Sequence, residues 1–408
     1  MNTGIEKLKE FFEAGSKEDE SFNIGLEVEH FVLNKENHKT MLFDGEQGIG
    51  SLMEEMASDY PEKHMEDGAV ISLESDDILI TLEPGCQLEI STAPFSSIDK
   101  IMHFYHEAKE QIEKRLAPMG YFLSTEGYLP YGKAEDIPLI AKERYHCMDA
   151  YFKNSGIYGK NMMRATAACH VSIDYFDEED FADKYRLAWL LNPIFAFLTE
   201  NVTRFEDVPF KGHLLRDTIW QGVDNARTSL CPDLFEESFG FESYARWLMT
   251  IPVIVVNEGD TYKYEPEKTI EECFEEYGDS EALLRHYLSM AFPDVRLKQF
   301  IEIRSADSMP EEYVKAYCCL VKGIFCNQET VVNMLSLLPQ DIQAINQAKD
   351  NLKKDGFQAS VYGQNIRLML LWLLRESAAN LPDDEKAALA LWEPLIDNEI
   401  SIQGAIQK

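Results

Sequence analysis

Two glutamates stand two positions apart in the segment Ile24–Phe31, which reads IGLEVEHF. Successive side chains of a strand point to opposite faces, so Glu27 and Glu29 share one face while Leu26 and Val28 take the other. Two carboxylates about 7 Å apart on one face can each hold a divalent cation, or share one through bridging oxygens. The wet face of a half-buried sheet gives the same pattern, so this segment alone leaves both interpretations open.

The same alternation recurs in three later segments. In each, positions of one parity carry carboxylates, arginine or histidine, and positions of the other parity are apolar. The polar positions are Gln87, Glu89 and Ser91 in the first segment, Arg164, Thr166, His170, Ser172 and Asp174 in the second, and Glu302 and Arg304 in the third. A Pro-Gly turn or bulge at residues 84–85 aims Glu83 at the same region.

These polar faces are acidic. Glutamates at 27, 29, 83, 89 and 302 stand against only two arginines, Arg164 and Arg304. If the strands pair, the carboxylates repel one another strongly in a partly buried site unless cations intervene. Mg²⁺ needs few protein carboxylates and keeps coordination positions for substrate phosphates. The pattern therefore favours a magnesium-dependent site that uses a nucleotide, provided that the strands lie side by side.

Residues 215–230 form a candidate anion-binding loop, with Gly222 and two arginines, Arg216 and Arg227. Arginine forks suit carboxylates and phosphates, although a surface loop with local Asp–Arg pairs gives the same composition. The sequence has no GxxxxGK[ST], strand–GxGxxG–helix, GxSxG or HExxH motif, so a P-loop does not hold the nucleotide. His170 is a candidate base or ligand, whereas His30 fits a core histidine.

Strand-like segments that alternate with amphipathic helices must position these residues. The predicted strands are Asn23–Leu33, Ala69–Leu73, Ile78–Leu82, Cys86–Thr92, Tyr121–Gly127, Met162–Tyr175, Ile251–Val256 and Lys298–Arg304. Helices are expected at Ile98–Leu116 and Asp183–Thr203, and only helices from about residue 310. We expect one α+β domain over residues 1–408, with an antiparallel sheet, helices on one side, a core at about 20–310 and a helical tail at about 310–408.

Composition limits the partners and the cellular compartment that we expect for this chain. The 408 residues carry 38 Lys+Arg against 72 Asp+Glu, a formal charge of −34, which argues against nucleic-acid or anionic-membrane partners. The N-terminal residues lack a basic region followed by an apolar run, so no signal peptide is expected. The eight cysteines form no CxxC pair and mostly sit in apolar runs, which predicts buried free thiols and a cytoplasmic location.

Several motifs together resemble the glutamate–cysteine ligases, most closely the plant and proteobacterial type. The matching segments, in chain order over about residues 22–310, are IGLEVEHF, LEPGCQLEIST, RYHCMDAYF, MMRATAACHVSIDY, IWQGVDNARTSL, FGFESYARW and FIEIRSADSMP. The plant pattern LEPGGQ reads LEPGCQ here, with Cys86 at the second glycine. A histidine at His170 resembles the more distant enterobacterial type, and Arg304-Ser-Ala-Asp mixes the two types.

The resemblance implies a glutamine-synthetase-like fold, an antiparallel sheet bent into a funnel with ATP and Mg²⁺, or Mn²⁺, inside. It implies that ATP phosphorylates the γ-carboxyl of glutamate and that the cysteine amine then attacks, as in the first step of glutathione synthesis. The implied metal ligands are Glu27, Glu29, Glu83, Glu89 and Glu302. The implied nucleotide-site residues are Glu27, Glu89, Glu302 and Arg304, and the implied catalytic residues are Arg164, Arg227, Arg304 and His170.

Two alternatives stay open. One is a related carboxylate–amine ligase that joins glutamate to another amine, and the other is a non-catalytic nucleotide-binding homologue. A monomer or a homodimer is expected, with small-molecule substrates as its only partners. The acidic residues at positions 27, 29, 89 and 302 together with Arg227 argue against a degenerate site.

Overall fold

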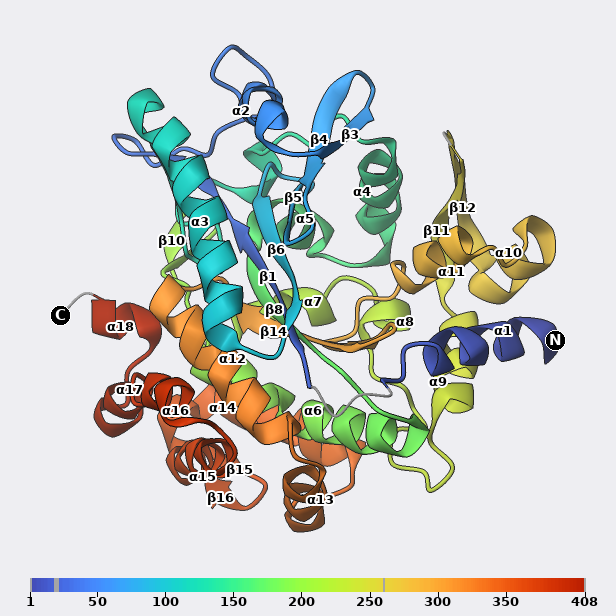
Figure 1. The fold of residues 1–408 in the computed structure, drawn as a ribbon, viewed down its shortest axis with the longest axis vertical. Coiled ribbons are helices and arrows are strands. Elements are labelled where there is room, and N and C mark those ends of the chain that lie inside the picture. Colours follow the sequence, from blue (N-terminus) through green and yellow to red (C-terminus); the bar gives the residue numbers. More distant parts are fainter. Residues whose placement is uncertain (1, 18–21, 260, 407–408) are drawn as a thin grey trace.

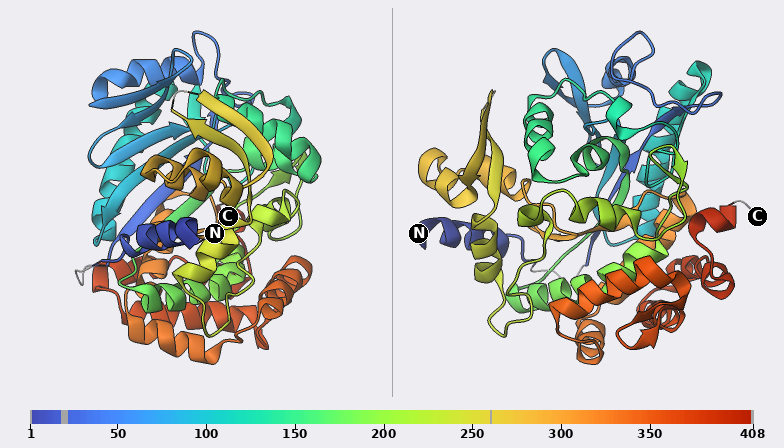
Figure 2. Two further views of the ribbon diagram at one scale, coloured as in Figure 1. Left: turned by 90° about the vertical axis from the view of Figure 1, so that its right-hand side faces the viewer. Right: turned by 180° about the vertical axis from the view of Figure 1, so that it is seen from behind.

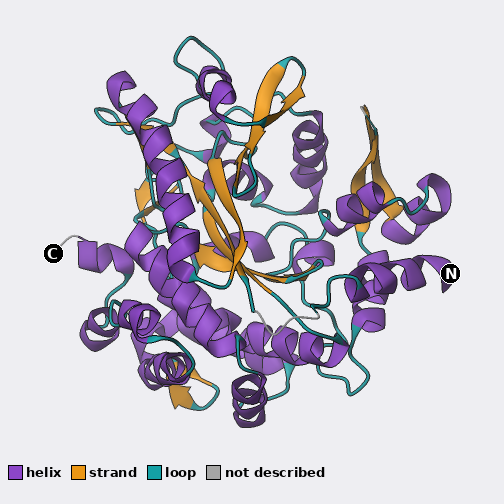
Figure 3. Ribbon diagram, viewed as in Figure 1, coloured by secondary structure: helices purple, strands orange, loops and turns teal. Residues whose placement is uncertain are grey.

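The structure is a computed structural model, and it describes residues 2–17, 22–259 and 261–406. Its centre is an eight-stranded sheet in which every neighbouring pair is antiparallel (Figures 1 and 3). From edge to edge the strands are β13 (Val295–Leu297), β14 (Ile301–Asp307), β8 (Ala168–Ile173), β1 (Ile24–His30), β6 (Leu88–Phe95), β5 (Ile78–Leu82), β4 (Ala69–Glu74) and β3 (Glu62–Glu66).

The remaining strands form two-stranded pairs: β2 (Val32–Asn34) with β7 (Tyr121–Leu123), β9 (Arg204–Phe205) with β10 (Val208–Pro209), β11 (Pro252–Glu258) with β12 (Thr261–Thr269), and β15 (Ser360–Val361) with β16 (Gln364–Asn365). The helices up to the sheet's last strand are α1 (Asn2–Glu13), α2 (Ile49–Met56), α3 (Ile98–Leu116), α4 (Glu143–Ser155), α5 (Gly159–Ala165), α6 (Glu178–Leu198), α7 (Leu215–Gln221), α8 (Asn225–Thr228), α9 (Phe241–Met249), α10 (Ile270–Tyr277) and α11 (Glu281–Leu288). After it come α12 (Glu311–Phe325), α13 (Gln328–Leu337), α14 (Ile342–Asp355), α15 (Ile366–Ala379), α16 (Asp383–Leu389), α17 (Glu393–Asn398) and α18 (Ile402–Ile406).

Helices cover one face of the sheet because its strands alternate in polarity. Helix α3 contacts β1, β5 and β6, α12 contacts β1 and β8, and α6 contacts β13 and β14. Helix α3 begins at the cap residue Ser97, whose side chain accepts from the backbone N–H of Lys100. Its buried stripe includes Ile101 and Ile112, and burying one such side chain stabilises the fold by about 1.5–3 kcal/mol.

The predicted α+β class with an antiparallel sheet is confirmed, with two differences. Helices α4, α5 and α7 lie on the other face of the sheet as well, so the helices do not pack on one side only (Figure 1). The region after β14 gathers beneath the sheet (Figure 2) and is helical apart from the small β15–β16 pair, which the helical pattern did not predict.

Strand boundaries differ most where apolar runs lack turn residues. The predicted strand Met162–Tyr175 is α5 followed by β8, and the predicted strand Lys298–Arg304 spans the turn between β13 and β14. The predicted helix Ile98–Leu116 matches α3. Within the described residues, no helix combines the length and the apolar character needed to cross a membrane.

Candidate active site

A cavity of about 350 Å³ lies on the face of the sheet opposite α3 and α12. Its walls come from β1, β6, β8 and β14, from the turn between β5 and β6, and from α4, α5 and α7. The acidic, basic and histidine side chains of the lining are Glu27, Glu29, Glu83, Glu89, His170, Lys142, Arg144, Arg296, Lys298 and Arg304. Aromatic and apolar side chains complete the wall: Tyr145, Met148, Met162, Met163, Trp220 and Phe292.

The strand register brings the predicted acidic residues together. Glu27 pairs with His170 across β1 and β8, and Glu29 pairs with Glu89 across β1 and β6. Direct cross-strand partners have Cβ atoms about 4.5–5.5 Å apart. The predicted shared face of Glu27 and Glu29 is confirmed, since both line the cavity while Leu26 and Val28 are buried in the core.

Glu27, His170 and Glu302 form one group, whose potential ligand atoms all lie within 4.8 Å of one another. His170 Nδ1 donates to Glu27 Oε2 at 3.2 Å. Burial, together with the nearby Arg304, lowers the pKa of His170 to about 4, so its imidazole is neutral at pH 7. A neutral histidine beside two carboxylates is a donor set that suits a divalent cation.

Glu302 is fully buried and ionised. Its carboxylate accepts from Arg296 Nε at 2.7 Å, from Lys298 Nζ at 2.8 Å and from Arg304 Nη1 at 3.1 Å. Burial alone raises the pKa of a carboxyl, but these three cations outweigh it and hold the pKa of Glu302 well below its usual range. The same cations line the cavity, where they can meet an anionic substrate.

Glu29, Glu83 and Glu89 form a second group, to which no cation of the described residues comes as close as those around Glu302. Burial and the neighbouring Glu83 raise the pKa of Glu29 to about 7. Burial and the charge of Glu27 raise the pKa of Glu89 well above its usual range, and burial raises that of Glu83. The hydrogen bonds of this group come from neutral donors, Ala168 N to Glu29 at 2.8 Å and Thr81 Oγ1 to Glu89 at 3.0 Å.

The predicted turn at Pro84–Gly85 delivers Glu83 to the cavity. A Cβ atom at Gly85 would lie 2.6 Å from the backbone oxygen of Arg164, so only glycine allows this approach. Gln87 fixes the turn, because its Oε1 accepts from Gly85 N at 2.8 Å and its Nε2 donates to the carbonyl of Thr166 at 2.9 Å. The neighbouring Cys86 adopts a positive φ of 68°.

The structure adds cations that the sequence pattern did not single out: Lys142, Arg144, Arg296 and Lys298. Arg296 lies directly opposite Glu302 across the β13–β14 hairpin. The sequence could have revealed Arg296, because it stands between the apolar residues Val295 and Leu297 in the same alternation of polar and apolar positions. Arg144 is the first residue of the RYHCMDAYF motif and lies in the first turn of α4, and Lys142 is the cap residue before that helix; no periodic pattern marks either as inward-facing.

Two predicted arginines lie outside the cavity lining. Arg164 is on helix α5, not on a strand, because the run before β8 is helical; it pairs with Asp149 and donates to the carbonyl of Ile137 at 2.9 Å. Arg227 is fully buried behind the wall residue Phe292, whose ring centroid lies 5.8 Å from its guanidinium.

The guanidinium of Arg227 is held from two sides. Its Nε donates to Asp224 Oδ2 at 2.8 Å and its Nη1 to the carbonyl of Met290 at 2.7 Å. Its Nη2 is buried and has no hydrogen-bond partner among the described residues. A direct role for Arg164 or Arg227 in binding substrate stays a prediction, and this geometry favours Arg304 over both.

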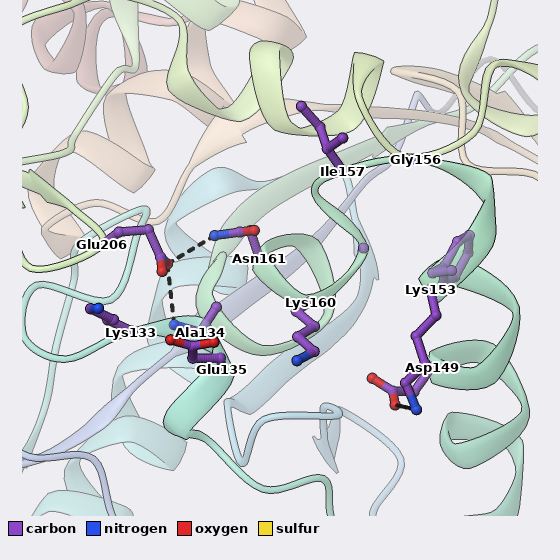
Figure 4. A pocket seen from close by; sticks show the side chains of 12 residues that line it. Lys133, Ala134, Glu135, Asp149, Lys153, Gly156, Ile157, Lys160, Asn161 and Glu206 are labelled. Atoms are coloured by element: carbon purple, nitrogen blue, oxygen red, sulfur yellow. Dashed lines mark hydrogen bonds and ion pairs between the residues drawn. The ribbon is translucent and has the colours of Figure 1, made fainter.

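A second pocket, of about 440 Å³, lies on the other side of α4 and α5 (Figure 4). Its lining includes Lys133, Lys153, Lys160, Glu135, Asp149 and Glu206. Glu206 accepts from Ala134 N at 3.1 Å and from Asn161 Nδ2 at 2.8 Å. Asp149, the partner of Arg164, lines this pocket and not the first. None of the strand glutamates lines this second pocket, so the 350 Å³ cavity is the candidate active site.

Comparison with known proteins gives concordant matches. A family model described as glutamate-cysteine ligase family 2 (GCS2) matches residues 23–379. The chloroplastic glutamate–cysteine ligase of Brassica juncea is 29% identical over 344 residues, covering 81% of this chain and 66% of that protein. The chloroplastic enzyme of Nicotiana tabacum is 30% identical over 351 residues, covering 81% and 65%. The chain therefore spans about two thirds of the length of these plant relatives.

A solved structure shares the fold. The glutamate–cysteine ligase of Francisella tularensis, crystallised in complex with AMP, superposes with a TM-score of 0.55 at 13% identity, covering 92% of this chain and 82% of that one. At this identity the likeness concerns the arrangement of the elements alone. It agrees with the expected antiparallel sheet and packed helices.

Proposed function

The chain belongs to glutamate-cysteine ligase family 2, and from this premise we propose that it joins the γ-carboxyl of glutamate to the amine of cysteine with consumption of ATP. One observation carries the proposal: a single cavity holds two carboxylate groups, Glu27–Glu302 and Glu29–Glu83–Glu89, together with a rim of arginines and lysines. The likeness to an AMP-bound ligase supports a nucleotide in this cavity.

The residues fit divalent cations. The pKa of Glu29 stays raised although the charges of Arg216 and Arg304 lower it, and burial with the neighbouring glutamates raises that of Glu89; a bound Mg²⁺ or Mn²⁺ would compensate these carboxylates further. The Glu27–His170–Glu302 group offers three ligand atoms close together. When bound, the metals neutralise charge on phosphate oxygens and so let the anionic γ-carboxylate approach ATP.

The protein side chains supply orientation and charge. In the proposed reaction the γ-carboxylate attacks the γ-phosphorus of ATP, ADP leaves, and the amine then displaces phosphate from the acyl phosphate. Arg304 and Lys298, which face the cavity, are placed to stabilise charge on the transferring phosphoryl group. Neutral His170 carries a lone pair on Nε2, where the guanidinium of Arg216 lies at 3.4 Å; a metal ion or the proton released by the amine could take this lone pair by replacing that long contact.

Free thiols fit the proposed compartment. All eight cysteines are free, and six of them are buried. Proteins that keep so many unpaired thiols are typical of reducing compartments. We therefore place the proposed enzyme in the cytoplasm.

The test is a ligation assay with ATP, Mg²⁺ and glutamate against a panel of amines. We expect γ-glutamylcysteine, ADP and phosphate in equal amounts with cysteine, and slower reaction with serine, alanine and 2-aminobutyrate. Preference for an amine without a thiol would reassign the acceptor. A protein that binds ATP without turnover in any mixture would support the non-catalytic alternative.

A further inference from the structure

Helix α7 presents one pair of side chains to the cavity and another pair to the C-terminal helices. Residues four positions apart lie on the same side of a helix. Arg216 and Trp220 form the first pair: Trp220 lines the cavity, and the Arg216 guanidinium lies 5.3 Å from its ring centroid. Asp217 and Gln221 form the second pair, and both contact lysines of α14.

On the cavity side, Arg216 holds two residues of the candidate active site. Its Nε donates to the backbone carbonyl of Arg304 at 3.1 Å, and its Nη2 donates to His170 Nε2 at 3.4 Å. The side chain is buried, so few other positions are open to it. A shift of α7 would therefore move the contacts that fix Arg304 and His170.

On the opposite side, Lys349 of α14 bridges two segments. Its Nζ lies 2.6 Å from Asp217 Oδ1 and 2.7 Å from Asp294 Oδ2. Asp217 follows Arg216 directly in the chain, and the backbone carbonyl of Asp294 accepts from the N–H of Arg304 at 2.8 Å. Lys349 thus holds both partners of the Arg216–Arg304 contact.

A second lysine of α14, one helical turn later, also contacts α7. Lys353 Nζ lies 2.7 Å from Asp217 Oδ2 and donates to Gln221 Oε1 at 3.0 Å. Lys349 and Asp217 are 5% and 6% exposed, so this ion pair is shielded from solvent and is screened little by salt. It differs from the many exposed pairs on this surface, which constrain geometry weakly.

We propose that Lys349 is a positioning residue, through which the C-terminal helical region holds α7 in the place that sets Arg216 against Arg304 and His170. This inference rests on the proposed function, in which those groups act on anionic substrates. The C-terminal helices are then part of the active-site scaffold, although none of their side chains lines the cavity.

A matched control lies in the same region. Partly buried Lys322 and buried Glu385 form another ion pair, at 2.6 Å, that ties α12 to α16 without touching α7. Lys349→Met and Lys322→Met each remove, from the C-terminal helices, one lysine that pairs with a buried carboxylate. The two variants therefore separate a general loss of stability from a loss of active-site geometry.

We expect Lys349→Met to lower kcat/KM by about 10- to 100-fold, mostly through kcat, because misplacing a catalytic group by about 1 Å costs rate rather than folding. Lys322→Met should stay within about threefold of the native rate at a comparable loss of melting temperature, and Lys349→Arg should recover most of the lost activity. Equal losses in both methionine variants, or no rescue by arginine, would overturn the proposal.

A double-mutant cycle tests the route. If Lys349 acts through Arg216, adding Lys349→Met to an Arg216→Lys protein should cost less than about threefold more, because the contact has already been lost. A second loss as large as in the native background would overturn the proposal. Lys353→Met, which removes the outer and more exposed lysine, should give a smaller effect of the same kind, and it serves where Lys349→Met does not fold.

Hydrogen exchange gives a readout that needs no activity. The backbone amides of α7 should exchange at least about tenfold faster in Lys349→Met than in the native protein. In Lys322→Met the exchange rate of these amides should not change. Unchanged protection of α7 in Lys349→Met would overturn the proposal whatever the assay shows. If the native protein instead forms no γ-glutamyl product while α7 loosens as expected, the proposed function fails and the structural tie stands.

Discussion

Glu29 on β1 and Glu89 on β6 are direct cross-strand partners on the cavity face of the sheet. Like charges in this arrangement destabilise a sheet. Burial and the neighbouring carboxylates raise the pKa of both, and their hydrogen-bond donors are neutral. Such a conflict with local stability is typical of a functional site, and it supports the proposed binding of a divalent cation here.

The first prediction concerns metal and pH. Because the pKa of Glu29 lies near 7, this carboxyl holds a proton below that pH, and a metal must displace the proton to bind. We expect the affinity for Mg²⁺ to rise by at least about tenfold per pH unit between pH 5 and 7, because Glu29 must lose its proton and the raised pKa of Glu89 adds to the dependence. The measurement is the shift in melting temperature on adding Mg²⁺ to EDTA-treated protein at each pH.

The difference between the two melting temperatures isolates the site. Buried groups elsewhere, such as His30 with a pKa lowered to about 4 and Asp307 with a pKa raised to about 7, titrate in both samples and cancel. A shift on Mg²⁺ addition that does not depend on pH would contradict the raised pKa. If Mg²⁺ shifts the melting temperature at no pH, the proposed metal site is wrong.

The second prediction is that Glu29→Gln abolishes metal-dependent turnover without weakening the metal-free fold. A carboxyl group whose folded-state pKa is raised makes its full contribution to stability below its unfolded pKa, and this contribution is lost as the pH rises through the folded pKa. Removing the charge should therefore stabilise the metal-free protein at pH 8, by up to about 3 kcal/mol for a shift of this size. Urea unfolding in EDTA measures it.

Glu74→Gln is the matched control, because Glu74 lies exposed on β4 of the same sheet. It should change neither urea stability nor Mg²⁺ dependence. If Glu29→Gln ligates at a near-native rate with normal Mg²⁺ dependence, the assignment of Glu29 as a metal ligand is wrong.

The third prediction separates two arginines that sequence resemblance treats alike. Arg304 lines the cavity and donates to Glu302, whereas Arg164 pairs with Asp149 outside it. Replacing a planar fork by a point charge removes a preorganised donor. We expect Arg304→Lys to lower kcat/KM by about 10²–10³-fold, on the order of 3–4 kcal/mol of transition-state stabilisation, and Arg164→Lys by less than about tenfold. A larger loss in Arg164→Lys would favour the resemblance over the geometry.

Much of the sheet was predictable because its strands alternate. The period of two in Ile24–Phe31 placed Glu27 and Glu29 on one face correctly, and β5 and α3 begin and end where the sequence pattern predicts. The segment before β8 was not predictable in the same way. Met162–Ala165 joins good helix formers to an apolar run with no turn residue between them, so a period of two and a helical period fit about equally well.

The cationic half of the site was less accessible from sequence. Arg216 stood in a segment that already suggested anion binding, but its partners His170 and Arg304 come from other strands. Lys349 lies in the C-terminal helices, where a buried lysine looks like any solvated helical position. Which cations meet which carboxylates depends on packing between distant segments, and local periodicity carries no information about it.

The last prediction tests the proposed mechanism through the fate of one oxygen atom. A carboxylate is a poor electrophile and an amine cannot displace oxide from it, so the γ-carboxyl must first gain a leaving group from ATP. Glutamate labelled with ¹⁸O in its side-chain carboxyl should then transfer one labelled oxygen to inorganic phosphate for each dipeptide formed, measured by mass spectrometry of the phosphate. In the proposed mechanism Arg304 and Lys298, which line the cavity beside the carboxylate groups, would offset charge as the two anions approach. Unlabelled phosphate would exclude the acyl phosphate, and AMP in place of ADP would indicate adenylation. Labelled phosphate with another amine, and none with cysteine, would preserve the mechanism and change only the acceptor.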